Sequence, residues 1–415
     1  MQNREKPTQE APIIEKREET TCCIVGAGPA GAILALLLAR KGVEVTLLEE
    51  HMDFERDFRG DTVHPSTMEI LEQLGLAERL LQLEHTKAPV LAFQTPRGNP
   101  IAVDFRHLHT PYPYITLIPQ ARFLEFITRE ASYYPTFHLV MGARAERLIE
   151  EDGYIYGVQY RAHDGWHELR AILTVGADGR FSRVRKLAGF EPVKSSAPMD
   201  VLWFRLPHEA NDTQRDGFIL GPGHFLVQLN RGDTWQLGYI ILKGSYQQVK
   251  AAGLPHFREE IARLVPVFKE RLETITEWKQ ISVLSVESSR VPRWYKPGLL
   301  LIGDAAHVMT PVGGVGINYA IQDAVAAANL LTEDLKAGKV RTEKLARVQK
   351  RREPPTRKIQ AFQNIAQRRV ARILHTEQAQ IIPPAIALLL RLPFLRNWQA
   401  NLIAFGPRPE RVRNP

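Results

Sequence analysis

A glycine-rich turn between two apolar segments constrains the fold of this chain more than any other feature. Residues 22–25 (CCIV) predict a short buried strand, and the turn GAGPAG (residues 26–31) follows at once. A helical apolar stretch then runs to Arg40, and residues 43–48 predict a second strand that ends at Glu49. Strand, glycine turn, helix and strand stand in the order that a dinucleotide-binding unit requires.

Each glycine of this turn has a physical role in holding a pyrophosphate. Gly26 allows the tight turn, Gly28 lets the backbone approach the phosphates, and Gly31 lets the helix pack closely on the strand. The start of the helix offers free N–H groups and a positive dipole end to an anion. Glu49 comes 18 residues after Gly31, where a carboxylate can accept a hydrogen bond from a ribose hydroxyl. The candidate cofactor-binding residues of this unit are Gly26, Gly28, Pro29, Ala30, Gly31, Glu49 and Glu50.

A second glycine loop lies late in the chain. Residues 299–302 predict a buried strand that Gly303-Asp304 ends, and Pro311 with three glycines makes a bend before an Ala-rich helix over residues 316–335. A second helix N-terminus therefore follows a glycine-rich loop, with a carboxylate before it. These residues are compatible with a second nucleotide or with one long cofactor that is contacted at both ends.

A third segment, TVGADGRFSRVRKLAGF (residues 174–190), combines a strand end, an Asp-Gly turn and three arginines. By itself it is equally typical of a turn followed by a solvated basic helix.

Together the three segments resemble the FAD-dependent aromatic hydroxylases, the single-component flavin monooxygenases of the para-hydroxybenzoate hydroxylase fold. The resemblance covers roughly residues 20–335. The family pattern D-G-x-x-S-x-x-R is matched by Asp178, Gly179, Ser182 and Arg185. The pattern G-D-A-A-H-x-x-x-P-x-x-G-x-G-x-N is matched by Gly303, Asp304, Ala305, Ala306, His307, Pro311, Gly314, Gly316 and Asn318.

The resemblance implies FAD as cofactor and NADPH or NADH as transient reductant. It assigns the first turn to the ADP half of FAD and the later loop to the flavin ring, whose reduced form is anionic. A helix N-terminus stabilises such an anion by ~0.3–1 kcal/mol. It adds as candidate cofactor-binding residues Arg59, Gln120, Arg122, Asp178, Arg185, Gly303, Asp304, Pro311, Gly314, Val315, Gly316, Ile317 and Asn318. For His307, catalysis and a hydrogen-bonded packing role both stay open, and for Arg59 and Arg122 the alternative is a surface ion pair.

The expected fold class is α/β: a Rossmann-like FAD-binding domain with an inserted β-sheet substrate domain and C-terminal helices. The proposed division is a flexible arm (1–19), a discontinuous FAD domain (20–190 and 290–335), a β-rich substrate domain (191–289) with a further part near 85–115, and a helical region (336–415). Gln228 and Tyr239 are the candidate substrate residues, with solvent contact and packing as their alternatives.

Charge and composition exclude several classes. The net charge is +8, but eleven Lys or Arg and two Glu between residues 341 and 372 already carry +9. The basic footprint of a nucleic-acid-binding protein is therefore missing. Cys22 and Cys23 are neighbours, so they predict neither a disulfide framework nor a metal site. The N-terminus lacks a signal sequence, and we expect a cytoplasmic protein.

The C-terminal region is expected to be a basic helix broken at Pro354-Pro355, followed by an apolar segment (381–406) that is too interrupted to span a bilayer. Packing on the FAD domain is the first interpretation of that segment, and a weak peripheral membrane contact is the second. The oligomeric state is left open.

The resemblance implies hydroxylation of an aromatic or polyketide-like small molecule by NAD(P)H and O₂, through a flavin C4a-hydroperoxide. The cofactor then carries the oxygen chemistry, which agrees with the lack of a recognisable set of catalytic side chains. A flavin-dependent halogenase is an alternative, although its usual Trp-x-Trp-x-Ile-Pro stretch is not found. A non-enzymatic FAD-binding module, epoxidation and Baeyer–Villiger oxidation also stay open.

Overall fold

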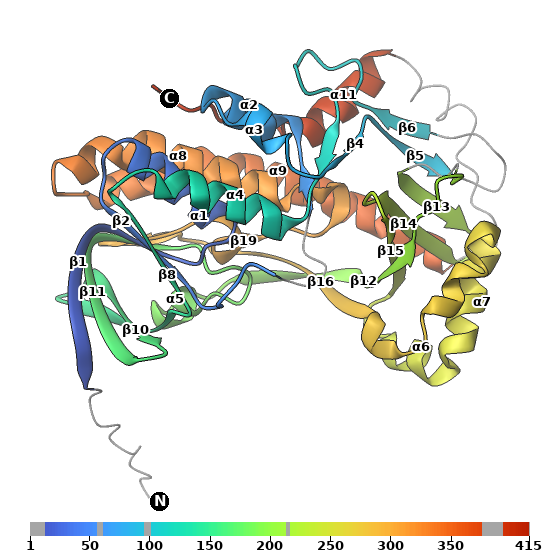
Figure 1. The fold of residues 1–415 in the computed structure, drawn as a ribbon, viewed down its shortest axis with the longest axis horizontal. Helices are drawn as coiled ribbons and strands as arrows, with labels where there is room; N and C mark the ends of the chain where they lie inside the picture. The colour runs from blue at the N-terminus through green and yellow to red at the C-terminus, as the bar shows by residue number, and fades with distance from the viewer. Residues whose placement is uncertain (1–12, 56–60, 95–100, 213–215, 376–392, 415) are drawn as a thin grey trace, which may run out of the picture.

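Two large β-sheets and a layer of long helices organise the chain (Figure 1). The structure is a computed structural model, and it describes residues 13–55, 61–94, 101–212, 216–375 and 393–414. The first sheet has the order β17-β18-β11-β1-β2-β8, with β10 and β9 continuing from β11. Its strands are β1 (Ile14–Val25), β2 (Val45–Glu49), β8 (Phe137–Met141), β9 (Arg144–Glu151), β10 (Tyr154–Ala162), β11 (Gly165–Gly176), β17 (Tyr295–Lys296) and β18 (Leu299–Leu301).

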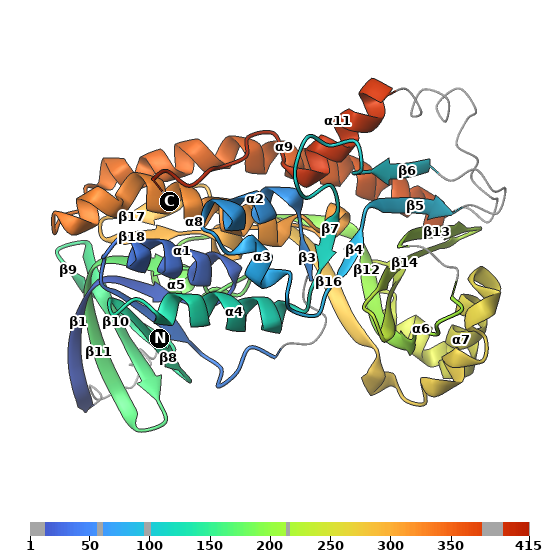
Figure 2. The same cartoon turned by 45° about the horizontal axis from the view of Figure 1, so that its top comes forward.

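The centre of this sheet is parallel and apolar, so it needs cover on its faces. Ile24 of β1 lies opposite Val175 of β11 and Leu47 of β2. Helices cover the sheet in Figure 2, and a continuous apolar core joins strands and helices. These helices are α1 (Pro29–Arg40), α2 (Pro65–Gln73), α3 (Ala77–Leu80), α4 (Gln120–Ser132) and α8 (Gly316–Lys336), while α5 (Arg183–Leu187) follows β11. The predicted α/β fold class is confirmed.

The second large sheet has the order β19-β16-β12-β15-β14-β13-β5-β6. Its strands are β5 (Val90–Gln94), β6 (Ile101–Asp104), β12 (Val193–Pro207), β13 (Gly217–Gly221), β14 (His224–Asn230), β15 (Thr234–Leu242), β16 (Ser282–Arg290) and β19 (His307–Val308). A three-stranded sheet is formed by β3 (Thr62–Val63), β7 (Ile115–Leu117) and β4 (Thr86–Ala88).

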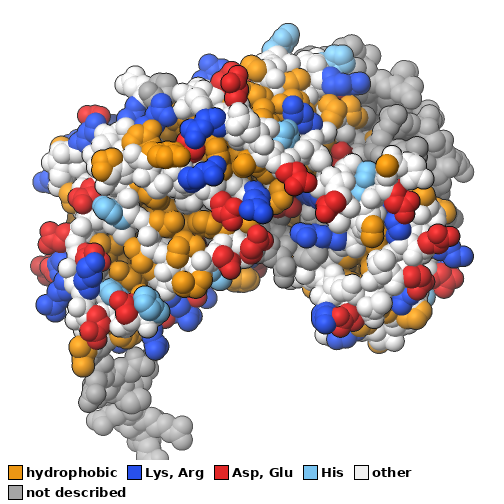
Figure 3. Space-filling view, viewed as in Figure 1, with side chains coloured by type: hydrophobic (Ala, Val, Ile, Leu, Met, Phe, Trp, Pro, Cys, Tyr) orange, Lys and Arg blue, Asp and Glu red, His pale blue; other side chains and the backbone are white. Residues whose placement is uncertain are grey.

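The second sheet has two apolar faces with different partners. One face packs against α6 (Tyr246–Ala252), α7 (Leu254–Leu264) and the short 3₁₀ turns η1 (Pro266–Phe268), η2 (Arg271–Thr274) and η3 (Trp278–Gln280). The other face contributes to a cluster with Val312 and with Leu374 at the end of α9 (Thr342–Leu374). Figure 3 shows a hollow between the lobe of the first sheet and the lobe of α6 and α7.

Strand β1 starts earlier than the sequence predicted. It begins at Ile14, and residues 14–19 pair with β11, for example Glu18 with Leu169. The predicted flexible arm of residues 1–19 is therefore wrong for its last part, because backbone pairing with a long neighbouring strand holds these polar residues. Residues 1–12 lie outside the described part of the chain.

Helix α9 is not broken at its two prolines, which corrects the expectation of a basic helix that breaks at Pro354-Pro355. The helix is 33 residues long and continues without interruption through Pro354 and Pro355. Proline removes an N–H donor from a helix, so tertiary contacts must offset the loss. Arg352, just before the prolines, is fully buried and bonded on several sides, and the Thr356 hydroxyl donates to its carbonyl at 2.9 Å. These contacts hold the helix together across the prolines.

The last helix, α11 (Pro393–Ala404), packs mainly on β6 of the second sheet, which differs from the expected packing on the FAD domain. It also reaches α8, where Leu402 packs with Tyr319. Most of the predicted segment before it lies outside the described residues. In the part of the chain that the structure describes, no helix combines the length and the apolar character needed to cross a membrane.

Candidate cofactor site

The first glycine turn (residues 26–31) has the geometry that its sequence predicted. Gly26 has φ +100°, and a Cβ there would lie 2.6 Å from the carbonyl oxygen of Ala177. A Cβ on Gly31 would lie 1.9 Å from the carbonyl oxygen of Gly26, so only glycine lets α1 approach β1 this closely. At Gly28, by contrast, a Cβ would meet nothing within 4 Å. The open space at the start of α1 fits the approach of a phosphate group.

Glu49 lies at the carboxyl end of β2 and faces this turn. Its Oε2 accepts a hydrogen bond from the Ala27 N–H at 3.0 Å, and its Oε1 is 2.8 Å from Nδ1 of His51. The side chain is almost buried, at 11% exposed. Glu49 therefore supports the turn directly, while its proposed bond to a ribose stays a prediction. Glu50 is exposed and pairs with Arg144 at 3.0 Å, so its geometry gives no support to a cofactor contact.

Asp178 stabilises the start of helix α5, whose N-cap is Ser182. Its Oδ1 accepts from the Ser182 hydroxyl at 2.5 Å, and its Oδ2 accepts from the N–H groups of Arg183 and Val184 at 2.6 and 3.0 Å. Burial raises the pKa of Asp178, and these hydrogen bonds oppose the rise. The Asp-x-x-x-Ser spacing thus explains the local fold, and a direct contact between Asp178 and the cofactor stays a prediction.

Arg185 connects α5 to the second glycine region. Its guanidinium donates to the carbonyl oxygens of Ala305 at 3.0 Å and Arg180 at 2.7 Å. The residue is 6% exposed, so it acts on this backbone and not on solvent. Its predicted role in cofactor binding is at most indirect in this geometry. Arg183 pairs with Glu146 of β9 at 2.6 Å, so its side chain is engaged in an ion pair of the protein itself.

The two glycine regions meet in space. Gly303, in the 3₁₀ turn η4 (Gly303–Ala305), has φ +58°, and a Cβ there would lie 3.1 Å from the Cβ of Ala30 and 3.2 Å from the Cβ of Ala320. The start of α1, the end of β18 and the first turns of α8 therefore touch. This arrangement favours one long cofactor contacted at both ends over two separate nucleotides. Asp304 lies half-buried beside it.

The second glycine loop (residues 311–316) includes the 3₁₀ turn η5 (Val312–Gly314) and bends at Gly313 and Gly314. Gly313 has φ +81° and Gly314 φ +62°, and a Cβ on Gly314 would lie 2.7 Å from the Thr62 hydroxyl. Gly316 differs, because it begins α8 without a positive φ, and a Cβ there would lie 3.8 Å from Met309. The backbone requirement for glycine thus falls on 313 and 314, while Gly316 leaves room in front of a helix N-terminus.

Asn318 ties this loop to the segment before α2. Its Oδ1 accepts from the His64 N–H at 2.9 Å and from the Thr67 hydroxyl at 2.8 Å. The Thr62 hydroxyl donates to the Gly314 carbonyl at 2.9 Å. Burial lowers the pKa of His64 to about 4, so its ring is neutral near pH 7. Thr62, Thr67 and His64 could not be predicted from the sequence, because no local pattern pairs them with residues 251 to 254 positions later in the chain.

His307 belongs to a buried charge network, which favours the packing alternative over catalysis. Its Nε2 is 2.6 Å from Oδ2 of Asp323, and Arg352 donates to the other oxygen at 2.9 Å. Asp323 Oδ2 also accepts from the Gly303 N–H at 3.1 Å. Burial alone would raise the pKa of Asp323, but His307 and Arg352 more than offset it and the net shift is downward.

The remaining candidates lie at the edge of the site. Gln120 begins α4, and its N–H donates to Asp61 at 3.3 Å. Arg122 is exposed and pairs with Glu125 at 3.1 Å, which is the surface ion pair named as its alternative. Arg59 lies outside the described residues.

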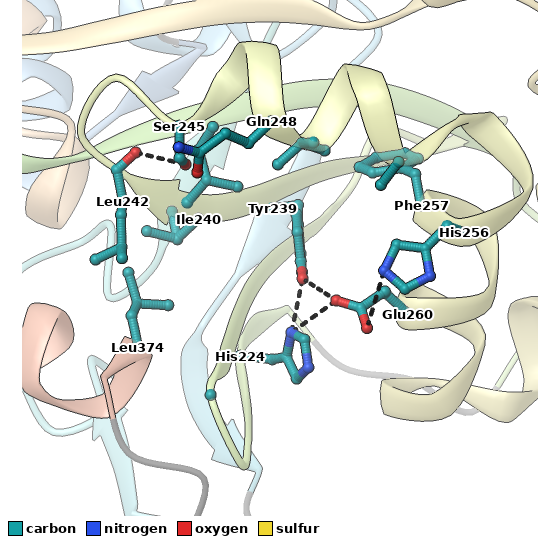
Figure 4. Close-up of a pocket in the computed structure, with 14 residues that line it drawn as sticks. His224, Tyr239, Ile240, Leu242, Ser245, Gln248, His256, Phe257, Glu260 and Leu374 are labelled. Carbon is teal, nitrogen blue, oxygen red and sulfur yellow. Dashed lines mark hydrogen bonds and ion pairs between the residues drawn. The ribbon is translucent and has the colours of Figure 1, made fainter.

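The two candidate substrate residues lie on the face of the second sheet that packs against α7. Tyr239 contacts Phe257, and its hydroxyl bonds to Glu260 at 3.1 Å and lies 2.6 Å from His224. Figure 4 shows these polar groups pointing toward one another in a pocket of about 320 Å³. Gln228 lies opposite Leu237, which packs on the α7 side of the sheet, while its neighbour Val227 packs on the other side. Gln228 therefore faces α7 as well. Their positions therefore do not support the predicted substrate role.

The opposite face of the sheet is aromatic and lies beside the second glycine loop. Phe93 and Phe218 stack with centroids 4.6 Å apart, and Phe225 tilts against Phe218 at 5.7 Å. Val312 packs in the same cluster. Ile403 of α11 packs with Phe93 and Phe218 in the adjoining cluster. Sequence alternation predicts two faces but not which one meets the loop, since that depends on how the sheets pack.

Comparison with known proteins identifies the family. A family described as an FAD binding domain matches residues 19–363. The chain belongs to this family. The flavoprotein is 34% identical over 397 residues to the 6-methylpretetramide 4-monooxygenase of Streptomyces rimosus, covering 95% of this chain and 94% of that protein. It is 30% identical over 329 residues to a 12-dehydrotetracycline 5-monooxygenase/anhydrotetracycline 6-monooxygenase of the same species, covering 73% of this chain and 60% of that protein.

Among solved structures, the flavoprotein is similar to p-nitrophenol 4-monooxygenase PnpA from Pseudomonas putida DLL-E4. The TM-score is 0.77 at 21% identity, with 95% of this chain and 100% of that chain covered. At this identity the likeness shows the fold alone. The family and its sequence relatives confirm the prediction of an FAD-dependent monooxygenase, for which NAD(P)H is the typical reductant.

Proposed function

We propose that this flavoprotein hydroxylates a polycyclic aromatic, polyketide-like small molecule with NAD(P)H and O₂. The observation that carries the proposal is the aromatic face of the second sheet beside the second glycine loop. Phe218 belongs both to the cluster that contains Val312 and to the cluster that contains Ile403, so this apolar surface extends from the loop to α11. A flat, largely apolar ring system fits such a wall.

The relatives support the same substrate class. The relative that this chain matches over nearly its whole length is named for a monooxygenation of 6-methylpretetramide. Transferring that chemistry to this chain is part of our proposal, as are the roles of the individual cofactor-site residues.

In this proposal the chain holds and orients the cofactor while FAD, reduced by NAD(P)H, supplies the activated oxygen. The start of α1 would hold the pyrophosphate, and Glu49 would orient the adenosine ribose. The N-terminus of α8, behind Gly316, would stabilise negative charge on the reduced ring. The aromatic face excludes water and aligns the substrate ring, so no side chain has to act as a nucleophile.

The proposal is tested by product formation. The purified holoenzyme is incubated with NADPH and a panel of phenols of one, two and four fused rings, and products are identified by mass with ¹⁸O₂. We expect ¹⁸O incorporation and the highest kcat/KM for the four-ring phenols. Oxygen transfer only to one-ring phenols would overturn the substrate class, and a protein that takes up no FAD would overturn the function itself.

A matched pair of variants tests the assigned wall. Phe218→Ala should raise KM for the four-ring phenol by about 10-fold, because a stacked aromatic contact is lost. Tyr246→Ala, a half-buried aromatic on the α7 side of the sheet, should leave KM unchanged. Equal effects of the two variants would contradict the choice of face.

A further inference from the structure

Helix α9 carries a row of buried glutamines along the face that it turns toward the molecule. The glutamine row consists of Gln349, Gln360, Gln363 and Gln367, which are 9%, 6%, 1% and 1% exposed. Amides with this degree of burial need hydrogen-bond partners. Most of their partners are backbone or hydroxyl groups of one continuous segment, residues 289–312, which leads into the second glycine loop. In addition, Gln349 donates to Glu353 of the same helix, and Gln360 accepts from the Arg290 guanidinium.

The first two members of the row contact the part of the segment that precedes the second glycine loop. Gln349 Oε1 accepts from the Trp294 N–H at 3.0 Å, and its Nε2 donates to the Pro292 carbonyl at 2.8 Å. Gln360 Nε2 donates to the carbonyls of Ser289 at 3.0 Å and Val308 at 3.1 Å. These contacts fix the strand segments on either side of β18.

Gln363 reaches the second glycine loop itself. Its Nε2 donates to the carbonyl of Thr310 at 3.0 Å and to the carbonyl of Val312 at 2.8 Å, one on each side of Pro311. Both partners can only accept, so the amide nitrogen has to face them. Gln367 adds a bond from its Nε2 to the Thr310 hydroxyl at 2.5 Å.

These bonds orient the peptide groups of the loop. The carbonyl oxygens of Thr310 and Val312 point toward α9, where they accept hydrogen bonds from Gln363. The carbonyl oxygen of Gly314 accepts a hydrogen bond from the hydroxyl of Thr62 in β3. Because each of these carbonyl oxygens is bonded to a donor of the protein, we infer that their negative ends are held away from the space in front of Gly316. The first N–H groups of α8 are then the backbone groups left to meet an anion there.

We propose that Gln363 is a positioning residue that aims the α8 N-terminus at the reduced flavin ring by holding the carbonyls on both sides of Pro311. The inference rests on the proposed placement of the ring at the second glycine loop. It concerns the reduction equilibrium of the bound cofactor, so it does not depend on which substrate the enzyme oxidises.

The test is the variant Gln363→Met, which keeps the length of the side chain and removes both donated bonds. The readout is the equilibrium between the bound flavin of the substrate-free holoenzyme and a reference redox dye, together with the Kd for FAD. We expect FAD still to bind and the equilibrium constant for reduction to fall roughly two- to fivefold, the range of a helix-dipole contribution. The ratio of hydrogen peroxide to NADPH consumed should rise in the same variant.

The matched control is Gln349→Met, which removes the same type of bonds from the same helix but at Pro292 and Trp294. It should lower Tm and leave the reduction equilibrium at the wild-type value. A Gln363→Met protein with wild-type reduction equilibrium, or an equal shift in both variants, would overturn the inference. If Gln363→Met does not fold, Gln367→Met replaces it. We then expect a smaller shift of the reduction equilibrium in the same direction, and an unchanged equilibrium would overturn the inference. A wild-type protein that binds no FAD would instead overturn the cofactor site.

Discussion

His307 Nε2 lies 2.6 Å from Asp323 Oδ2, and neither side chain is more than 1% exposed. The same carboxylate is bonded to Arg352, which continues to Glu410 at 3.3 Å. This network contacts the turn at Gly303, whose N–H donates a hydrogen bond to Asp323. His307, which the resemblance includes in a cofactor motif, therefore has a structural part in that motif, because its network fixes the Gly303 turn at the end of β18.

Removing Asp323 should be costly. Asp323→Ala leaves Arg352 buried with one carboxylate fewer, and breaking a buried pair in this way costs ~3–5 kcal/mol of unfolding free energy. Urea unfolding measures the change. The control is Asp334→Ala on the same helix, whose pair with Lys344 is partly exposed and should contribute less than about 1 kcal/mol. Equal losses in the two variants would show that the network contributes nothing special.

The Asp212–Arg271 pair predicts a pH dependence. Two hydrogen bonds of 2.7 and 2.8 Å from Arg271, with a third from Trp235, hold the pKa of Asp212 below its usual range. A lowered pKa gives stability that is present above the unfolded-state value of about 3.9 and is lost as pH falls through the folded-state value. Asp212→Asn should thus cost about 1–3 kcal/mol at pH 7, and the gap to wild type should begin to narrow below about pH 4 and shrink further as pH falls toward the folded-state value.

Urea titrations at a series of pH values from 7 downward, followed by Trp fluorescence, measure this gap. Asp233→Asn, an exposed neighbour in the same region, should show no gap at any of them. A gap for Asp212→Asn that persists unchanged in acid would contradict the assignment of the shift to Arg271.

Glu49 should matter for cofactor affinity. Glu49→Ala removes a charged acceptor near the first glycine turn, and the loss of ~1–3 kcal/mol would raise the Kd for FAD about 5- to 150-fold. Titration of the apoprotein with FAD, followed by flavin fluorescence, gives the Kd. Glu50→Ala is the adjacent control, and it should bind like wild type because Glu50 is exposed and pairs with Arg144. A normal Kd for Glu49→Ala would remove its assignment.

The two glycines of the second loop should separate strain from access. Gly314→Ala forces a side chain into a positive φ against Thr62, so it should lower unfolding free energy by about 1–3 kcal/mol even without FAD. Gly316→Ala has room and ordinary helical geometry, so apoprotein stability should be kept while FAD affinity falls. Thermal unfolding of the apoproteins and FAD titration measure the two effects. Full FAD affinity in Gly316→Ala would place the flavin elsewhere.

The sequence predicts the parts of this fold whose causes are local. The first glycine turn, β18 and the start of α8 all follow from short patterns, and the structure places them as expected. Gly316 shows what a motif alone cannot predict. A glycine in a motif can be required by a positive φ or by the space that a ligand needs, and only the φ values of the structure distinguish Gly314 from Gly316.

Long-range packing decided what the sequence could not. Alternation in β14 marks Gln228 as an odd polar residue, yet which face of the sheet meets the second glycine loop depends on the docking of α7 and α9. The continuation of α9 through Pro354 likewise depends on buried contacts of Arg352 with residues far along the chain. Local propensity favours a break there, and tertiary structure outweighs it.

The strand order of the first sheet has a consequence for how the chain folds. β11 is the central neighbour of β1 on one side and of β18 on the other, with Cys22 opposite Leu173 and Thr174 opposite Leu299. Strands β1 and β18, which lead into the two glycine regions, are therefore both hydrogen-bonded to β11, and β11 is distant from each of them in sequence. Loop closure of this kind is slow, because the entropy of long connections is lost before the pairing is gained. On the ribosome, the first glycine turn (26–31) is therefore made long before the second glycine loop (311–316), and the two regions can meet only when most of the chain has been synthesised.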